Sequence, residues 1–176
     1  MHSPRHSLHL LRHAKAERVD AFDDKDRPLA RRGREAAGRV GDALAKSLGK
    51  VDLVLCSTSL RTRETAELAL ARFDPRPQIL HEDGIYLAST EALLRRLARL
   101  DESVGAVMVI GHNPGLHELA VALASPYSPH HRALANGTFT PGAWVGFAVA
   151  VRWSELDQAR HEPLGYLTPK LLSDRG

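Results

Sequence analysis

Three short apolar runs stand out along the chain, and each ends abruptly in polar residues. They cover positions 8–11, 51–56 and 106–110, and only His9 and Asp52 interrupt them. Runs of this length, bounded by polar residues, are typical of buried strands in a sheet that is covered on both faces. The pattern therefore predicts three buried strands at these positions.

In the segments between these runs, apolar residues recur every three or four positions. This spacing places them on one face of a helix and predicts amphipathic helices over residues 30–48, about 60–72, 90–100 and about 115–125. Strands that alternate with helices form βαβ units, in which consecutive strands run parallel. We therefore expect an α/β fold, a three-layer α/β/α sandwich with a mainly parallel central sheet, forming a single domain over residues 1–176.

Residues that favour helix ends support these boundaries. Pro28 precedes the first helix, where its fixed φ is favourable, and Gly49 is expected to end that helix as its C-cap. The hydroxyls of Ser57-Thr58-Ser59 can cap the second helix. Asn113 as N-cap, with Pro114 at the first helical position, is expected to start the fourth.

The remaining segments are less regular. Residues 14–29 are polar and charged, which predicts a loop over the end of the first strand, and residues 78–81 are a short strand candidate. Residues 126–142 are rich in Pro, His and Gly, which predicts a long loop. Residues 143–153 predict a last strand, for which the edge of the sheet is a candidate place, and the tail from Ser154 has no clear period.

The composition is that of an ordinary globular protein with a preference for arginine. Hydrophobic residues make up 43% of the 176 and charged residues 26%, which is enough apolar material for a core. The net charge is only +3, but 19 of the 24 basic residues are arginine, which recognises phosphate and carboxylate through a planar fork of donors. Aromatic residues make up 5%, few for stacking on bases, so we expect no nucleic-acid partner.

Cysteine content and hydropathy bear on the compartment. Cys56 is the single cysteine, so the chain can form no internal disulfide, which is compatible with the cytosol. No apolar stretch approaches the roughly 18–20 residues that a membrane span needs. The apolar run near the start is too short for a secretory signal. We therefore expect a cytoplasmic protein without membrane contact.

The three predicted strands end in residues that can bind and transfer phosphate. Arg12 and His13 follow the first strand, Ser57 and Arg61 the second, and His112 the third. In a parallel sheet these ends share one edge, beside helix N-termini that favour anions. Arginines can hold phosphoryl oxygens while a neutral imidazole attacks phosphorus, so the pattern suits phosphoryl transfer. The glycine-rich motifs of dinucleotide-binding and P-loop proteins do not occur.

Four segments in order resemble the histidine phosphatase (phosphoglycerate mutase-like) superfamily, most closely its small SixA-type branch of phosphohistidine phosphatases. They are Leu10–Glu17, Asp26–Leu29 with Gly33, Ser57–Arg61 with Thr65-Ala66, and Gly111–Gly115. Ala14 stands where the family often has glycine, a small change that we expect to be tolerated. The resemblance implies an α/β/α sandwich that uses no metal and no organic cofactor.

The resemblance also implies roles for individual residues. His13 matches the nucleophile, Arg12 and Arg61 match the two phosphate-binding arginines, and His112 matches the second histidine, which is both catalytic and phosphate-binding. Asn113, next to it, is expected to act as a helix cap first and as a phosphate contact second. Arg63 is the neighbour with which Arg61 could be confused, and the spacing from Ser57 favours Arg61.

The proton donor is the residue that the resemblance does not supply. Larger family members carry an acidic donor on an inserted segment, and the gap between Arg61 and Leu80 is too short for one. Glu82 is our first candidate for a catalytic acid, and Asp26 is the second. A phosphohistidine substrate has an imidazole leaving group that can depart without a strong enzyme acid, so a missing donor favours a P–N substrate.

These features lead to a hypothesis and two alternatives. The hypothesis is a phosphatase that works through a phosphohistidine intermediate on His13 and acts on a phosphorylated protein at histidine. One alternative is a phosphomonoesterase with a small phosphate substrate. The other is a non-catalytic phosphate-binding module, against which the intact Arg12, His13, Arg61 and His112 argue. The lack of a large insertion predicts a shallow, open pocket.

Other polar residues are assigned more ordinary roles. Ser57 is expected to serve as a cap or as a hydrogen-bond partner of the site, and Lys15 to add positive potential at its rim. His130 and His131 are expected on a mobile loop that borders the pocket. Because adjacent residues do not face each other well and no third ligand is suitably spaced, we expect no metal site there.

Overall fold

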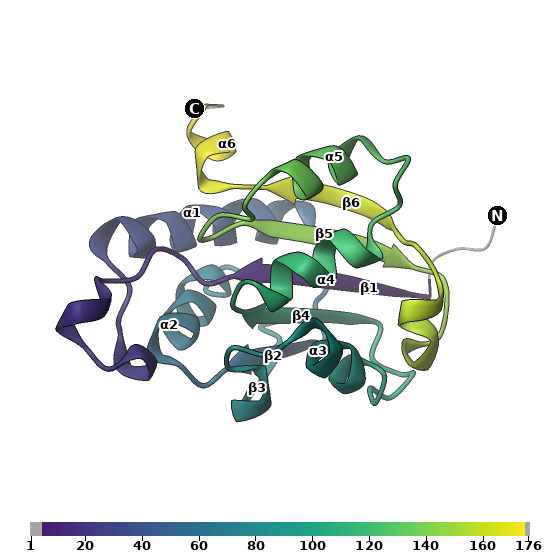
Figure 1. The fold of residues 1–176 in the computed structure, drawn as a ribbon, viewed down its shortest axis with the longest axis horizontal. Helices are drawn as coiled ribbons and strands as arrows, with labels where there is room; N and C mark the ends of the chain where they lie inside the picture. Colours follow the sequence, from purple (N-terminus) through teal and green to yellow (C-terminus); the bar gives the residue numbers. More distant parts are fainter. Residues whose placement is uncertain (1–4, 175–176) are drawn as a thin grey trace.

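A six-stranded sheet with helices on both faces organises the structure, a computed structural model that describes residues 5–174 (Figure 1). The strands lie in the order β3-β2-β4-β1-β5-β6. Their bounds are β1 His6–Arg12, β2 Leu53–Ser57, β3 Gln78–Glu82, β4 Ala106–Gly111, β5 Trp144–Val149 and β6 Glu162–Leu167. The three buried strands predicted from the apolar runs are β1, β2 and β4, which lie side by side.

The sheet is mainly parallel, as expected. β3, β2, β4 and β1 run parallel to one another, whereas β5 pairs antiparallel with β1, and β6 antiparallel with β5. β5 was considered for an edge position, but it ends at Val149 and lies inside the sheet because β6 pairs along its outer side. β6 lies in the tail from Ser154, where no strand was predicted, because Pro163 and Gly165 interrupt the alternation of apolar and polar residues.

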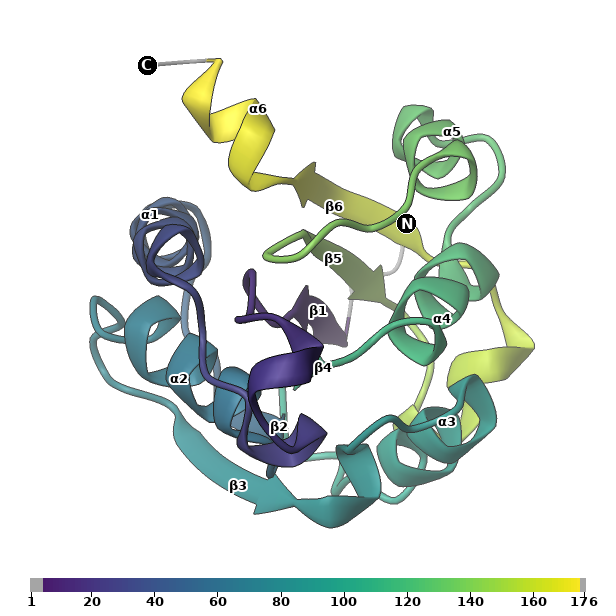
Figure 2. The same cartoon turned by 60° about the vertical axis from the view of Figure 1, so that its left-hand side comes forward.

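Six helices cover the two faces within residues 5–174. Their bounds are α1 Arg31–Ser47, α2 Leu60–Ala69, α3 Thr90–Leu97, α4 Gly115–Leu123, α5 Pro129–Asn136 and α6 Pro169–Ser173. Figure 2 shows α1 and α2 on one side of the sheet and α3, α4 and α5 on the other. The expected three layers are therefore confirmed.

Alternate residues of β1 enter two separate cores, which fixes the layers. Leu8 and Leu10 pack with α3 and α4, where Leu97 and Leu119 are buried. Leu11 packs on the opposite face with the helices α1 and α2. Because successive side chains of a strand point to opposite faces, this alternation requires an apolar helix on each side.

The segment between α4 and β5 differs from the prediction. Residues 126–142 were expected to form a long loop, but they contain α5. The helix begins at Pro129, and the Ser128 side chain caps it by accepting a hydrogen bond from the His130 main-chain N–H. A hydroxyl cap followed by proline at the first helical position is a helix-start signal, hidden here among other turn-forming residues. His130 and His131 therefore lie on a helix.

Two of the expected helix caps are also wrong. The C-cap of α1 is Leu48 in an extended conformation, so Gly49 does not terminate the helix with a left-handed turn. Pro114 occupies the N-cap position of α4, and the Asn113 side chain points elsewhere. Ser59 caps α2 as expected from the Ser-Thr-Ser segment, accepting from the main-chain N–H of Thr62.

The charged loop after β1 crosses the carboxyl ends of the strands (Figure 2). It contains two 3₁₀ turns, η1 Val19–Ala21 and η2 Asp24–Asp26. A third, η3 Asp83–Ile85, follows β3, and Lys25 forms an ion pair with Asp83 at 2.7 Å. Within residues 5–174 no helix has the length and apolar character needed to cross a membrane.

Candidate active site

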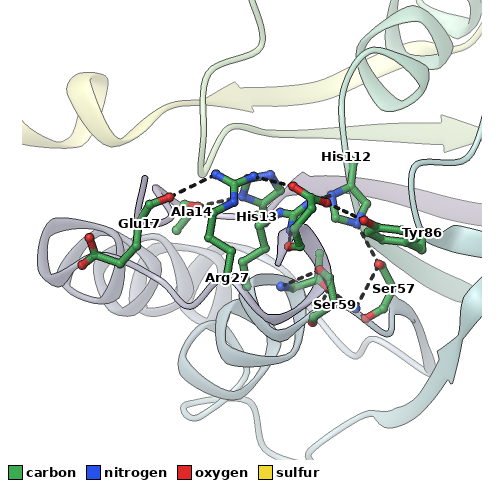
Figure 3. A network of polar contacts seen from close by, with 11 residues as sticks. His13, Ala14, Glu17, Arg27, Ser57, Ser59, Tyr86 and His112 are labelled. Atoms are coloured by element: carbon green, nitrogen blue, oxygen red, sulfur yellow. Dashed lines mark hydrogen bonds and ion pairs between the residues drawn. The ribbon is translucent and has the colours of Figure 1, made fainter. Parts of the chain in front are cut away.

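The structure brings the expected residues of three strand ends together. His13 follows β1 and His112 follows β4, and because Arg12 is in register with Gly111, the two histidines leave the sheet side by side. Their ring centroids are 5.3 Å apart. Arg61 reaches the same place from the first turn of α2 and is 1% exposed. Figure 3 shows both histidines within one polar network.

The surroundings of His13 keep its imidazole neutral. Its Nδ1 lies 2.8 Å from the main-chain oxygen of Ala14, and because a carbonyl only accepts, Nδ1 carries the proton. The lone pair is therefore on Nε2. Burial, together with the nearby His112 and Arg61, lowers the pKa of His13 to about 3, against the opposing effect of the Ala14 carbonyl. The ring is accordingly uncharged at neutral pH.

His112 is held at both ring nitrogens. Its Nε2 lies 2.7 Å from Ser57 Oγ, and its Nδ1 lies 3.3 Å from Arg61 Nη2. A guanidinium only donates, so Nδ1 accepts and Nε2 donates its proton to the serine hydroxyl. Burial, followed by the positive charge of Arg61, lowers the pKa of His112 to about 4. Ser57 thus has the hydrogen-bonding role that was expected of it.

Arg12 and Asn113 hold the segment before β5. Arg12 Nη1 donates to the carbonyl of Phe139 at 3.1 Å, and Asn113 Nδ2 donates to the same carbonyl at 3.1 Å and to that of Thr138 at 3.0 Å. Burial lowers the pKa of Arg12, as does the charge of Arg61. Asn113 therefore shapes the wall of the site, and its contact with phosphate stays a prediction.

Three residues of the site, Asp24, Arg27 and Tyr86, were not singled out from the sequence. Arg61 donates through Nη1 to the main-chain oxygen of Asp24 at 2.5 Å and through Nη2 to Asp24 Oδ2 at 3.1 Å. Arg27 Nη2 donates to Oδ1 at 3.0 Å, and the Tyr86 hydroxyl donates to Oδ2. The Tyr86 hydrogen bond, with those of Arg27 and Arg61, lowers the pKa of Asp24 to about 2. Arg27 lies in Asp26–Leu29, one of the four segments that resemble the family, and this position was the signal in the sequence that could have identified it.

Both candidate proton donors lie outside this network. Glu82 ends β3, and its two oxygens accept from Nε and Nη2 of Arg96, each at 2.8 Å, in an ion pair that links β3 to α3. Asp26 is exposed. Within residues 5–174 neither carboxylate hydrogen-bonds to His13 or His112, so a catalytic role for either stays a prediction.

Lys15 and His131 were also expected near the site. Lys15 is exposed, as expected for a residue at the rim. His131 lines a hollow of about 420 Å³ on α4 and α5, which none of the residues Arg12, His13, Arg61 and His112 lines. In the described part of the chain there is no group of three or more His, Cys, Asp or Glu that could hold a metal ion.

Comparison with known proteins relates this chain to one family. The model of the histidine phosphatase superfamily (branch 1) matches residues 8–84. An uncharacterized protein of Mycobacterium tuberculosis (strain ATCC 25618 / H37Rv) is 33% identical over 163 residues, covering 91% of this chain and 100% of the relative.

Solved structures agree with this result. The candidate phosphohistidine phosphatase SixA of Nakamurella multipartitia is 31% identical, with a TM-score of 0.80 and coverage of 93% of this chain and 96% of that chain. The corresponding candidate SixA of Agrobacterium tumefaciens is 26% identical, with a TM-score of 0.77 and coverage of 94% and 99%. Both structures share the fold, and the family model includes the positions of Arg12, His13 and Arg61.

Proposed function

Because this chain belongs to the histidine phosphatase superfamily, in its SixA-type branch, and is a phosphoric-group hydrolase, we propose that it removes a phosphoryl group from a phosphorylated histidine in a protein, by way of phospho-His13. One observation carries the proposal: a buried, neutral His13 whose Nδ1 is tied to a carbonyl and whose Nε2 keeps its lone pair. Two arginines and a second histidine surround that nucleophile.

The first half-reaction transfers the phosphoryl group to the enzyme. Arg12 and Arg61 hold its non-bridging oxygens, which places phosphorus in line with Nε2 of His13. A bond forms between Nε2 and phosphorus while the substrate's P–N bond breaks. The substrate ring, protonated on its other nitrogen from solvent, keeps the electron pair and leaves as a neutral imidazole. In the second half-reaction water attacks phospho-His13, which releases inorganic phosphate and restores the neutral imidazole.

His112 stabilises the charge that develops on the phosphoryl oxygens. In the empty site its Nδ1 accepts from Arg61. A phosphoryl dianion beside the ring favours the protonated imidazole, because a nearby negative charge raises the pKa of histidine. The protonated Nδ1 then donates to a phosphoryl oxygen, while Ser57 keeps the ring in position through Nε2.

The state of two carboxylates, Glu82 and Asp24, favours a P–N substrate over a phosphate ester. An alkoxide leaving group needs a proton from the enzyme, whereas an imidazole is a better leaving group. Glu82 is engaged by Arg96, and the pKa of Asp24 is lowered to about 2, so neither is poised to donate a proton near neutral pH. This supports phosphohistidine as substrate rather than the ester of a small metabolite.

A comparison of substrates tests the proposal. Wild-type protein and His13→Ala are incubated with a phosphorylated histidine phosphotransfer domain and with a panel of phosphate esters, and phosphate release is measured. We expect release from the domain by the wild type, trapping of acid-labile phosphate on His13, and loss of both in His13→Ala. His130→Ala, on α5, is the matched control and should behave as the wild type.

Each part of the proposal has an outcome that overturns it. Release from none of the substrates would leave a phosphate-binding module without turnover. Turnover of an ester as fast as of the phosphorylated domain would replace the substrate by a small metabolite. Full activity in His13→Ala would refute the intermediate.

We also propose that residues 1–176 act as one domain. The single six-stranded sheet, to which both halves of the described chain contribute strands, supports this organisation. The cytoplasmic location and the lack of a nucleic-acid partner stay predictions.

A further inference from the structure

A carboxylate from the protein itself lies where the substrate's phosphate is expected. Asp24 offers Arg61 two acceptors, its main-chain oxygen at 2.5 Å from Nη1 and its Oδ2 at 3.1 Å from Nη2. Both terminal nitrogens of the proposed phosphate-binding arginine are therefore in use. The remaining nitrogen, the buried Nε, has no partner in the described part of the chain.

The carboxylate is bound much as a phosphoryl group would be. Besides Arg61, it accepts from Arg27 Nη2 at 3.0 Å on Oδ1 and from the Tyr86 hydroxyl on Oδ2. Figure 3 shows Arg27 and Tyr86 in the same network as His13 and His112. Carboxylates and phosphates accept the same paired hydrogen bonds from guanidinium groups. Donors that suit one of these anions therefore suit the other.

Asp24 is able to leave without unfolding the site. Its side chain is 40% exposed, whereas that of Arg61 is 2% exposed, so the carboxylate can turn into solvent while the guanidinium stays. The backbone around it is secured separately, by the ion pair of Lys25 with Asp83 at 2.7 Å and by Arg27 Nη1, which donates to the main-chain oxygen of Glu17 at 3.1 Å.

We propose that Asp24 is a resident anion of the phosphate subsite, which the phosphoryl group of the substrate must displace from Arg61. This inference rests on the proposed function, because it assumes that Arg61 binds the phosphoryl group. A phosphoryl dianion and the Asp24 carboxylate would repel each other if both were hydrogen-bonded to Arg61, so the two do not share this side chain.

The displacement determines which phosphates bind well. Free phosphate has only its contacts with the arginines and His112 to set against the lost Asp24 contacts, so it binds weakly. A phosphoryl group attached to a protein gains further contacts from the rest of its carrier. Asp24 thus selects against inorganic phosphate, which is also the product, and favours its release after each turnover.

Binding of inorganic phosphate to unphosphorylated protein provides the test. Asp24→Asn removes the charge and keeps the size of the side chain, and Asp23→Asn, one residue earlier on an exposed position, is the matched control. We expect the Kd for phosphate, measured by calorimetry, to fall about tenfold in Asp24→Asn and to stay unchanged in Asp23→Asn. Equal or weaker binding in Asp24→Asn overturns the inference, as does equal tightening in both variants.

A crystal structure of the wild type with bound tungstate gives an answer that needs no variant. We expect the oxyanion on Arg61 and the Asp24 carboxylate turned away, and Asp24 still bonded to Arg61 beside the bound oxyanion would overturn the inference. Failure here is distinguishable from failure of the proposed function. A protein that hydrolyses phosphohistidine while Asp24→Asn leaves phosphate binding unchanged refutes only the displacement. Tighter phosphate binding without turnover of any substrate refutes only the reaction.

Discussion

Ser57 Oγ lies 2.7 Å from Nε2 of His112, and the hydroxyl accepts the ring proton that Arg61, a pure donor, excludes from Nδ1. With Nε2 donating to the serine, Nδ1 is left as an acceptor toward Arg61, at 3.3 Å. The serine at the end of β2 therefore orients a ring that is presented by β4, and through that ring it orients the guanidinium.

Replacing Ser57 by alanine should reduce turnover more than substrate binding. The Nε2–H of His112 loses the acceptor that fixes the ring, so the ring turns more freely beside Arg61, and we expect kcat to fall about tenfold with KM little changed. The nitrogen chemical shift of His112 Nε2 should report the lost hydrogen bond. Ser47→Ala, at the exposed end of α1, is the control, and an unchanged Nε2 chemical shift in Ser57→Ala would contradict the assignment.

Arg61→Lys should lower kcat/KM on the phosphorylated domain by about a hundredfold. Lysine keeps the positive charge but loses the planar fork that can hold two phosphoryl oxygens. Arg63→Lys, two residues along the same helix and exposed, should retain wild-type kinetics. Similar losses in both variants would mean that overall charge, and not the geometry of Arg61, governs the reaction.

Gly33 and Gly38 in α1 should respond oppositely to alanine. A Cβ on Gly33 would lie 2.0 Å from the main-chain oxygen of Lys15, so Gly33→Ala must push α1 from the segment that follows His13. We expect the free energy of unfolding to fall by more than about 2 kcal/mol, and kcat with it. Nothing lies within 4 Å of a Cβ on Gly38, and Gly38→Ala should stabilise the helix by about 0.5–1 kcal/mol. Urea denaturation of both variants checks the pair.

Acid should destabilise the protein through its buried histidines. Burial lowers the pKa of His9 to about 4, that of His13 to about 3 and that of His112 to about 4. Below pH 6.5 the unfolded chain takes up protons that the folded protein does not, so the free energy of unfolding decreases as the pH falls. Each histidine should contribute a loss of about 2 kcal/mol between pH 7 and pH 5.

Urea titrations at several pH values separate one of these contributions. His9 stacks on Trp144, and His9→Phe keeps an aromatic ring there without a titrating group, so its stability should depend less on pH. Gln78→Phe, on an exposed position of β3, adds a ring without removing a titrating group and should keep the slope of the wild type. Identical slopes in all three proteins would show that His9 does not contribute.

The sequence was sufficient to predict the part of the site that lies at strand ends. His13, Arg61 and His112 follow distinct apolar runs, and the common edge of parallel strands brings them together whatever the details of the loops. Asp24 and Tyr86 could not be found in this way. They are 62 positions apart and meet through a loop with no periodicity, whose course depends on ion pairs such as that between Lys25 and Asp83.

The elements that were missed carry weak local signals. β6 contains Pro163 and Gly165, which are unfavourable inside a strand, and it is tolerated because it occupies the edge of the sheet. α5 buries only Leu134 among its residues, so no apolar stripe identifies it. In both cases tertiary packing, and not local preference, stabilises the element.

The backbone of His13 is bonded on both sides. Its N–H donates to the carbonyl of Gly111 at 3.1 Å, and its carbonyl accepts from the N–H of Gly142 at 3.0 Å, so the proposed nucleophile is bonded to β4 on one side and to the turn before β5 on the other. Exchange of the His13 amide with heavy water should therefore require opening of the sheet's centre. New substrate preferences would then arise through replacements in the loops around a stationary histidine, with the chemistry kept intact.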